Sequence, residues 1–375
     1  MHYIVINTQC IFNENFIYQV YMNKILETIT YVLFYVLLML VFLTLLVQTY
    51  IYLHSQKDNF SLTENYTNDE NENKVQCANL KRKYPKVPNL SCSVGSPNKE
   101  YPLKNFYIKT AYNAIALENY ITGKLDVCAV TNCLTQGARC LDFEVLSALD
   151  SNNRPEVYVA TNNQKRMFNI LSSQNKIPLS DVFKTLRDQA FSDICPCPND
   201  PCILHIRIKS SDKRIISMIV NEIKTFLRDK LLSMKYSYGC KQFQNQIGNV
   251  PLKDLSQKFV LLFHAPELSI RNTALYEYAN GITDSETIKT IYFDQVTEEN
   301  KDLIEFNKNA MTFVLPPITN KLVNYDYGVS KMNGCQFIAM SIQNKDKYMD
   351  DYNNFFLQNR YSFVLKPESI RSLNS

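Results

Sequence analysis

Three residue types are scarce in this 375-residue chain, and a strong charge of either sign is absent. There is no tryptophan, and there are only 8 glycines and 4 histidines. Lys and Arg number 40 against 36 Asp and Glu, a formal net charge of +4, which is too small to indicate a nucleic-acid partner. Hydrophobic residues make up 46% of the sequence, so a sizeable core can form and wholesale disorder is excluded. The length suits two average domains or one large α/β barrel.

The 11 cysteines are scattered along the chain. The only cluster is Cys195, Cys197 and Cys202, in a loop rich in Pro, Asn and Asp. A zinc site usually needs a second pair of ligands at matching spacing, and the histidines do not supply one. We interpret these residues as loop cysteines. The odd total argues against a dense disulfide framework and leaves the redox compartment open.

One long uncharged run dominates the N-terminal part. Residues 29–47 read ITYVLFYVLLMLVFLTLLV, and the apolar character continues weakly to residue 53. About 20 such residues span a bilayer as a helix, and tyrosines lie near both ends, where their rings favour the headgroup region. The preceding residues 1–28 are too long for the start of a signal peptide, and no small-residue cleavage site follows the run. We predict a single-pass transmembrane helix over residues 29–53 and a membrane location.

The orientation of this helix stays open at the level of the sequence. Lys24 lies on one side and Lys57 on the other, so the count of positive charges is nearly tied. Glycosylation sequons begin at Asn59, Asn65 and Asn89, which would suit an external face. In a chain this rich in asparagine we interpret them as chance occurrences.

The rest of the chain divides into a polar segment and an alternating α/β region. Residues 54–100 are polar and interrupted by prolines, which predicts a stalk without its own core. From residue 101, short apolar runs alternate with stretches of helical period, of which 179–191 (N-capped by Ser180) and 215–234 are the clearest. This order favours a parallel sheet, and eight strands fit a (β/α)₈ barrel. The expected strands are 106–108, 140–145, 157–159, 203–208, 259–263, 291–293, 312–315 and 337–342.

Several motifs in this region resemble the X and Y halves of eukaryotic phosphoinositide-specific phospholipase C. In the X half, Gly-Ala-Arg-Cys-Leu-Asp-Phe-Glu at 137–144 is similar to the family's Gly-Cys-Arg-x-Leu-Glu-Leu-Asp strand. The other X-like segments are 103–113, 155–159 and 201–207. In the Y half, Asn-Tyr at 324–325, Gly-Cys-Gln at 334–336 and Phe-Val-Leu-Lys-Pro at 363–367 keep the family's order. The resemblance implies a distorted barrel split into an X-like half (101–263), a linker (264–300) and a Y-like half (301–371).

The family's two catalytic histidines are missing from the matching positions. Cleaving a phosphodiester through the inositol 2-hydroxyl needs a base and an acid, and histidine suits both tasks. Here the two positions hold Tyr112 and Val159. A tyrosine of ordinary pKa, near 10, is a poor base at neutral pH, and valine transfers no proton. Only His205 and His264 remain in the predicted globular part.

The calcium-binding set that the resemblance implies is also incomplete. The family holds calcium with one Asn and three carboxylates, and Asn113, Asp142 and Glu144 match three of these positions. The fourth position is Arg207. Since His205 precedes Arg207 by two residues on one strand, both side chains should share one face of it, and the resemblance implies that this face is the barrel lumen. We predict that Arg207 pairs with Asp142 and Glu144, whereas the alternative is that Arg207 replaces the metal charge in a cryptic hydrolase that uses His205.

The motifs therefore predict a membrane-anchored phospholipase C-like protein with impaired catalysis and no cofactor. The family reaction is hydrolysis of phosphatidylinositol 4,5-bisphosphate to diacylglycerol and inositol trisphosphate. We expect a scaffold that binds phosphoinositide headgroups or a protein partner. The alternatives are an active phosphoric diester hydrolase with a rearranged site in lipid signalling, and a structural membrane protein. The end of the sequence soon after residue 367 predicts no C-terminal lipid-binding β-sandwich, so the transmembrane helix would provide membrane attachment.

Overall fold

The computed structural model describes most of the chain as two compact units that divide after Glu70. The described residues are 22–50, 69–83, 90, 98–118, 123–149, 152, 154–161, 164–166, 169–171, 173–210, 212–243, 246–266, 270–296, 298–316 and 323–372. The asparagines of the three sequons and residues 51–53 of the predicted membrane helix lie outside these ranges.

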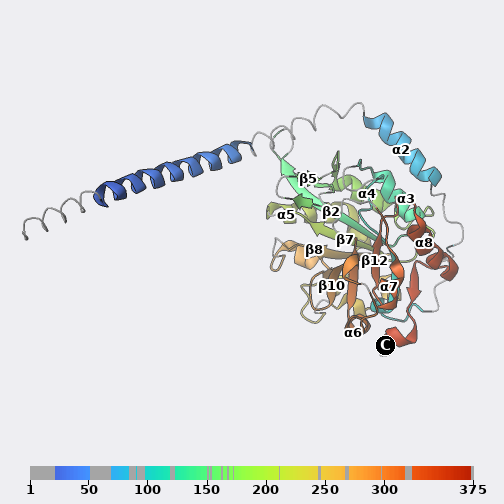
Figure 1. Ribbon diagram of the computed structural model, residues 1–375. Coiled ribbons are helices and arrows are strands. Elements are labelled where there is room, and N and C mark those ends of the chain that lie inside the picture. The colour runs from blue at the N-terminus through green and yellow to red at the C-terminus, as the bar shows by residue number, and fades with distance from the viewer. Residues whose placement is uncertain are drawn as a thin grey trace, which may run out of the picture. The chain divides into compact units, whose positions relative to one another are not determined.

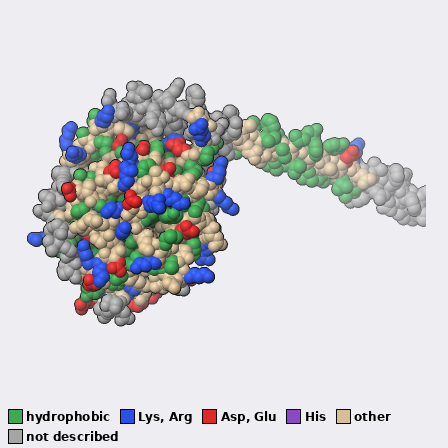
Figure 2. Space-filling model, turned by 180° about the vertical axis from the view of Figure 1, so that it is seen from behind, with side chains coloured by type: hydrophobic (Ala, Val, Ile, Leu, Met, Phe, Trp, Pro, Cys, Tyr) green, Lys and Arg blue, Asp and Glu red, His purple; other side chains and the backbone are tan. Residues whose placement is uncertain are grey.

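A single long helix, Met22–Tyr50, occupies the described part of the first unit. It begins seven residues before the predicted start. Its 29 residues extend about 44 Å at 1.5 Å per residue, more than the roughly 30 Å hydrocarbon core of a bilayer. Its apolar side chains are exposed along the helix, as Figure 2 shows. The helix is thus long and apolar enough to cross a membrane, a property that signal sequences near the N-terminus share.

The second unit is built around a nearly closed barrel of parallel strands (Figure 1). Neighbouring strands follow the order β10-β11-β12-β1-β2-β7-β8-β9, and each of these pairs is parallel. This confirms the predicted (β/α)₈ barrel class. The eight strands are β1 (Phe106–Ala111), β2 (Cys140–Leu149), β7 (Cys202–Ile208), β8 (Phe259–His264), β9 (Gly281–Ile282), β10 (Ile288–Tyr292), β11 (Met311–Leu315) and β12 (Phe337–Met340).

Amphipathic helices cover the outside of the sheet (Figure 1). In α4 (Leu179–Gln189) the buried residues Leu179, Val182, Phe183 and Leu186 recur at helical spacing, which is why this segment packs as a helix. Its N-cap is Pro178 rather than the predicted Ser180, because the helix begins two residues earlier than a cap at Ser180 would allow. The other barrel helices are α3 (Val127–Thr135), α5 (Arg214–Glu222), α6 (Lys301–Asn309), α7 (Tyr327–Met332) and α8 (Lys347–Asn359).

The predicted helix over 215–234 is shorter in the structure. After α5 the chain makes a π-helical turn, Ile223–Leu227, and then a 3₁₀ turn, Arg228–Lys230. Leu231 already pairs with Phe259 in an isolated parallel bridge. The helical pattern therefore ends where the chain pairs with the first residue of β8, well before it reaches that strand in sequence.

The prediction of which strands close the barrel was wrong at two places. β3 (Pro155–Val159) pairs antiparallel with the end of β2 and with β6 (Ile177–Pro178), so it is a strand outside the barrel path. The eighth barrel strand is β9, which lies with β10 in the segment 264–300 predicted as a linker. A two-residue strand is too short to show a periodic pattern, so β9 could not be predicted from residue spacing. The remaining strands are β13 (Phe363–Leu365), antiparallel to β1, and the β4 (Gln164–Arg166) and β5 (Asn169–Leu171) hairpin.

The structure also differs from the predicted stalk at residues 69–83, which form helix α2 (Asp69–Lys83). Leu80 of this helix is buried against Leu117 and Ala129, and a disulfide joins Cys77 to Cys128. Because one covalent bond and one leucine attach α2, rather than a full apolar face, its sequence carries no amphipathic pattern that would have predicted the contact.

Candidate active site in the barrel lumen

Strand register gathers the candidate residues on one face of three adjacent strands. Asp142 of β2 lies opposite His205 of β7, and Glu144 lies opposite Arg207. Arg207 in turn lies opposite His264 of β8. Residues that are paired across a parallel ladder, or two apart on one strand, point to the same face. That face is the barrel interior, since the ring of His205 lies 4.1 Å from the ring of Phe313 on β11 across the barrel.

Arg207 is the centre of this group. Its Nε donates to Asp142 Oδ1 at 2.8 Å, and its Nη2 donates to Asp142 Oδ2 at 2.7 Å. Its Nη1 donates to Glu144 Oε1 at 2.6 Å, and Nη2 also donates to Asn113 Oδ1 at 2.9 Å. The planar guanidinium fork suits such two-oxygen recognition. The predicted pairing of Arg207 with Asp142 and Glu144 is confirmed, and all four residues are brought together.

Asn113 reaches this group from the end of β1 through an unusual backbone conformation. Its φ is +41°, a left-handed value that asparagine adopts more readily than most residues. Its backbone N–H donates to Asp142 Oδ2 at 3.1 Å, while its side-chain Nδ2 is buried without a partner. The side-chain oxygen, the atom that would bind a cation, faces Arg207 instead.

The charges in this group stabilise one another. Burial alone would raise the pKa of Asp142, but Arg207 and the hydrogen bond from His205 outweigh burial and hold that pKa well below its usual value. Burial alone would lower the pKa of Arg207, but Asp142 and Glu144 outweigh it and raise that pKa well above its usual value. A buried carboxylate and a buried guanidinium therefore both remain ionised.

Two histidines lie close to these charges. His205 is fully buried, and its Nδ1 lies 2.8 Å from Asp142 Oδ1. Because Asp142 is ionised and can only accept, we assign the donated proton to Nδ1. His205 Nε2 is buried without a partner. His264 Nδ1 lies 3.1 Å from Thr283 Oγ1 and 3.2 Å from a carboxylate oxygen of Asp284.

Burial makes both histidines weaker bases than usual. The pKa of His205 is lowered by burial, and Asp142 only partly opposes this. The pKa of His264 falls to about 4, chiefly through burial and then through the nearby His205. Both imidazoles are therefore neutral at neutral pH. The sequence identified both histidines but gave no means of placing His264, whose position depends on strand register.

The two positions that match the family's histidines hold packed side chains. The Tyr112 ring lies 5.0 Å from Arg207 Cζ, a cation–π contact, and only 4% of the residue is exposed. Val159 is fully buried at the end of β3, opposite Val145 and Ile177. Val159 has no group that transfers a proton, and the ring of Tyr112 packs over the Arg207 guanidinium.

The surroundings of Arg207 are closed to solvent. Asn113, Asp142, Glu144 and His205 are each 0% exposed, and Arg207 is 4% exposed. A phosphate group would have to displace packed side chains before it could contact any of them.

The cysteines of the 195–202 loop do not gather around a common centre in the described structure. Cys195 Sγ accepts a hydrogen bond from Arg139 Nη1 at 2.9 Å, Cys197 is disulfide-bonded, and Cys202 begins β7. The sequence-based interpretation instead missed Cys77, Asp126 and Cys128, whose possible ligand atoms lie within 4.8 Å of one another. Cys77 and Cys128 are 51 residues apart, so no local motif marks the pair.

Comparisons with known proteins find one matching family and several solved structures of similar fold. The family model described as phosphatidylinositol-specific phospholipase C, X domain, matches residues 99–264. A search of curated protein sequences finds no match. The crystal structures of S. officinalis PLC21 and L. pealei PLC21 are each 17% identical to this chain, with a TM-score of 0.58, and the match covers 77% of this chain and 40% of each of those chains. At this identity the likeness shows the fold alone.

A bacterial structure is also similar. A calcium-dependent phosphoinositol-specific phospholipase C from the Gram-negative bacterium Pseudomonas sp. is 10% identical with a TM-score of 0.48, over 72% of this chain and 97% of that chain. The family match ends at residue 264, so the Y-like resemblance over 301–371 stays a prediction.

Proposed function

Because this chain is a relative of the phosphatidylinositol-specific phospholipase C family, with an X domain at residues 99–264, we propose that it is a membrane-anchored member with impaired catalysis. Its barrel would act as a scaffold that binds phosphoinositide headgroups or a protein partner. The chain spans 40% of the length of the two PLC21 structures that it matches, so activity is argued from this chain's own residues.

The arrangement around Arg207 supports this proposal most strongly. The family reaction needs a base, an acid and a positive charge near the phosphate. The guanidinium of Arg207 supplies positive charge, but its hydrogen bonds are directed at Asp142, Glu144 and Asn113. Removing one acid–base group typically lowers a rate about 10²- to 10⁴-fold. If both the acid and the base are lost, and the Arg207 guanidinium is bound to Asp142 and Glu144 instead of a phosphate, little catalysis remains.

The same residues do not fit calcium. Calcium takes about 6–8 oxygen ligands at roughly 2.3–2.6 Å. Here the side-chain oxygens of Asn113, Asp142 and Glu144 surround a guanidinium that would repel the ion. We therefore propose that calcium binding is lost.

The membrane anchor rests on the helix Met22–Tyr50. If the helix remains in the mature protein and spans a bilayer, alkaline carbonate should leave the full chain in the membrane pellet. Release of the chain into the supernatant, or an N-terminus that begins after residue 50, would exclude the anchor.

A second candidate is an active phosphoric diester hydrolase with a rearranged site. It is favoured by the pairing of Asp142 with His205, because a carboxylate that orients one imidazole nitrogen leaves the other free to take a proton. It is opposed by the complete burial of His205.

One assay separates the two candidates. The full chain would be reconstituted into phosphatidylcholine vesicles that contain phosphatidylinositol 4,5-bisphosphate, and the release of water-soluble inositol phosphate would be measured with calcium and with chelator. The proposed scaffold gives no release above protein-free vesicles under either condition. Release that the His205→Gln variant abolishes would instead establish the rearranged hydrolase, and calcium-dependent release would show that the metal site survives.

A further inference from the structure

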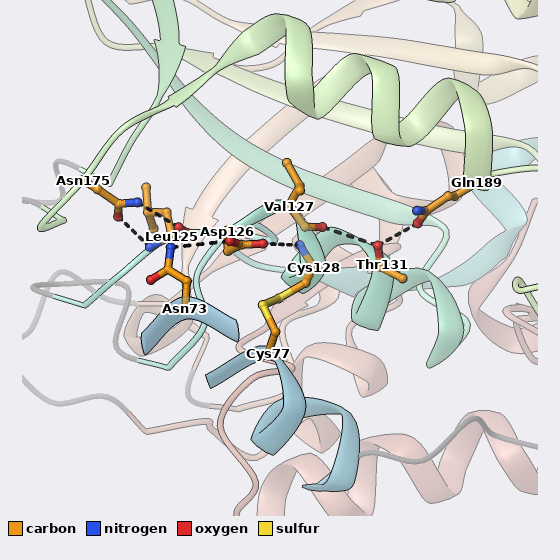
Figure 3. Close-up of a disulfide and its surroundings, with 9 residues drawn as sticks. All are labelled: Asn73, Cys77, Leu125, Asp126, Val127, Cys128, Thr131, Asn175 and Gln189. Atoms are coloured by element: carbon orange, nitrogen blue, oxygen red, sulfur yellow. Dashed lines mark hydrogen bonds between the residues drawn. A yellow bond between two sulfur atoms is a disulfide. The ribbon is translucent and has the colours of Figure 1, made fainter. Parts of the chain in front are cut away.

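A disulfide fastens helix α2 to the barrel. Cys77 of α2 bonds to Cys128 in the first turn of α3, across a sequence separation of 51 residues (Figure 3). Both cysteines are half-buried. The bond thus connects the segment between the N-terminal helix and the barrel with the barrel wall.

Without this bond, the attachment of α2 is weak. Among the α2 side chains that the structure describes, 73–83, only Leu80 is buried. Two of its polar contacts are long: Asn73 Nδ2 lies 3.5 Å from an Asp126 oxygen, and Lys83 Nζ lies 3.3 Å from a backbone oxygen. Burying one leucine contributes about 2 kcal/mol, whereas ordering each backbone residue costs about 1 kcal/mol. An isolated helix of 15 residues is itself marginal.

The barrel side of the bond is fixed by its own hydrogen bonds. Asp126 is the N-cap of α3, and its Oδ1 accepts from the backbone N–H of Cys128 at 2.8 Å. The side chain of Asn175 binds both backbone groups of Leu125, the residue before Asp126. Its Oδ1 accepts from Leu125 N at 2.7 Å, and its Nδ2 donates to Leu125 O at 2.9 Å (Figure 3). Cys128 is therefore held in position by the hydrogen bonds of its neighbours. The Cys77–Cys128 disulfide then fixes α2 to this part of the barrel.

The remaining cysteines agree with an oxidising environment. Cys197 is also disulfide-bonded. Among the described free cysteines, Cys133, Cys140, Cys195, Cys202 and Cys335 are buried, and only Cys240 is partly exposed. Disulfides of this kind form and persist in secretory or external compartments and are rare in the cytosol.

We propose that the Cys77–Cys128 bond is a clasp formed in an oxidising compartment, so that the barrel lies on the non-cytosolic side of its membrane. The side assignment rests on the proposed membrane anchor. The two thiols lose two protons and two electrons, and a disulfide-bearing oxidoreductase accepts the electrons by thiol–disulfide exchange and becomes a dithiol. The clasp holds α2 against the barrel, and the barrel faces the outer or lumenal leaflet.

Counting free thiols tests the clasp. Membranes containing the full chain would be denatured without reductant and treated with a polyethylene-glycol maleimide, which adds a fixed mass to each free thiol. If the clasp exists, Cys77→Ser and Cys128→Ser each gain one label relative to wild type, because each frees the other cysteine. If both thiols are reduced, each variant loses one label and the clasp is excluded. Cys240→Ser is the matched control and loses one label in either case.

A reduced pair that binds a metal is a separate outcome of the same experiment. Cys77, Cys128 and Asp126 could hold a thiolate-binding ion if the bond were absent. In that case wild type gains two labels only after a chelator is added before the maleimide. This result would overturn the clasp.

Protease protection tests the side of the membrane. In sealed microsomes with their cytosolic face outward, added trypsin should leave the barrel intact until detergent opens the vesicles. Digestion of the barrel without detergent would overturn the side assignment. Failure of the anchor itself would appear differently, as release of the chain by alkaline carbonate with an unchanged thiol count.

Discussion

Two arginines are buried at opposite ends of the barrel strands, and they have different partners. Arg139 lies just before β2 and is fully buried. Among the described residues it donates to uncharged groups, namely the backbone oxygens of Pro201 at 3.0 Å, Ala190 at 2.8 Å and Asp200 at 2.6 Å, and the Sγ of Cys195 at 2.9 Å. Arg207 lies near the end of β7 and donates to two carboxylates and an amide.

The difference separates a structural end of the barrel from a chemical one. In barrels of this type the carboxyl ends of the strands carry the chemistry, and the amino ends serve stability. Arg139 holds the loop before β7 and lies in the Gly-Ala-Arg segment that resembles the phospholipase C motif. Arg207, which the same resemblance predicts at a carboxylate position, joins the oxygens of Asn113, Asp142 and Glu144 into a buried ion-pair network. On the face in Figure 2, Lys and Arg side chains are interspersed with Asp and Glu.

The largest effect is expected when the charge at the chemical end is reversed. Arg207→Glu places a third carboxylate beside Asp142 and Glu144 and should destabilise the protein without calcium by more than about 5 kcal/mol, since removing one partner of a buried pair alone costs roughly 3–5 kcal/mol. Millimolar calcium should recover part of the loss, because a ligand that binds only the folded state stabilises it. Melting curves of the full chain in detergent, with calcium and with chelator, measure both effects.

Two controls accompany this variant. Arg207→Met should lose about 3–5 kcal/mol and show no recovery with calcium, and wild type should show no calcium-dependent shift. A calcium shift in the wild type would contradict the proposed loss of the metal site.

A smaller loss is expected at the structural end. Arg139→Met leaves three backbone oxygens without their donor and should destabilise the protein by roughly 3 kcal/mol. Calcium should have no effect on this variant, because no carboxylate accepts from Arg139. Arg139→Lys should recover only part of the loss, since an ammonium cannot reproduce the guanidinium fork. Denaturation of the full chain in detergent would measure these differences. If calcium restored the stability of Arg139→Met, the proposed difference between the two ends of the barrel would be wrong.

The smallest effect is the pH dependence of the lumen. The pKa of His205 is lowered in the folded state, and that of His264 is lowered to about 4. Below the ordinary histidine pKa, near 6.5, the unfolded chain therefore binds more protons, so stability falls as the pH drops from about 6.5 towards 4. The lowered pKa of Asp142 acts only below about pH 3.9.

Melting temperatures of wild type and His264→Gln across this pH range test the sign. The variant removes one titrating group and should show a shallower decline on acidification. A wild-type protein that becomes more stable at lower pH, or a variant with an unchanged slope, would mean that His264 does not titrate as its burial requires.

The sequence predicted local elements better than their connections. All eight expected strands lie on strands of the structure, because each was a short apolar run between turns. Whether a strand belongs to the barrel could not be predicted this way. The predicted strand 157–159 lies outside the barrel, and the barrel contains the unpredicted strand Gly281–Ile282. In the lumen, the spacing of His205 and Arg207 on one strand predicted their common face, but the approach of His264 needed the register of β7 with β8.

The amino-acid sequence by itself determined the long apolar helix and the alternation of strands and helices, and it places Tyr112 and Val159 where the resemblance predicts histidines. These are local properties, since they depend on residue type and on spacing within one segment. The tertiary structure decided the rest: that Arg207 takes the oxygens of Asn113, Asp142 and Glu144, that Arg139 binds a loop rather than a carboxylate, and that Cys77 meets Cys128. Each of these contacts joins residues that are 51 or more positions apart, and only the packing of the barrel brings such residues within bonding distance.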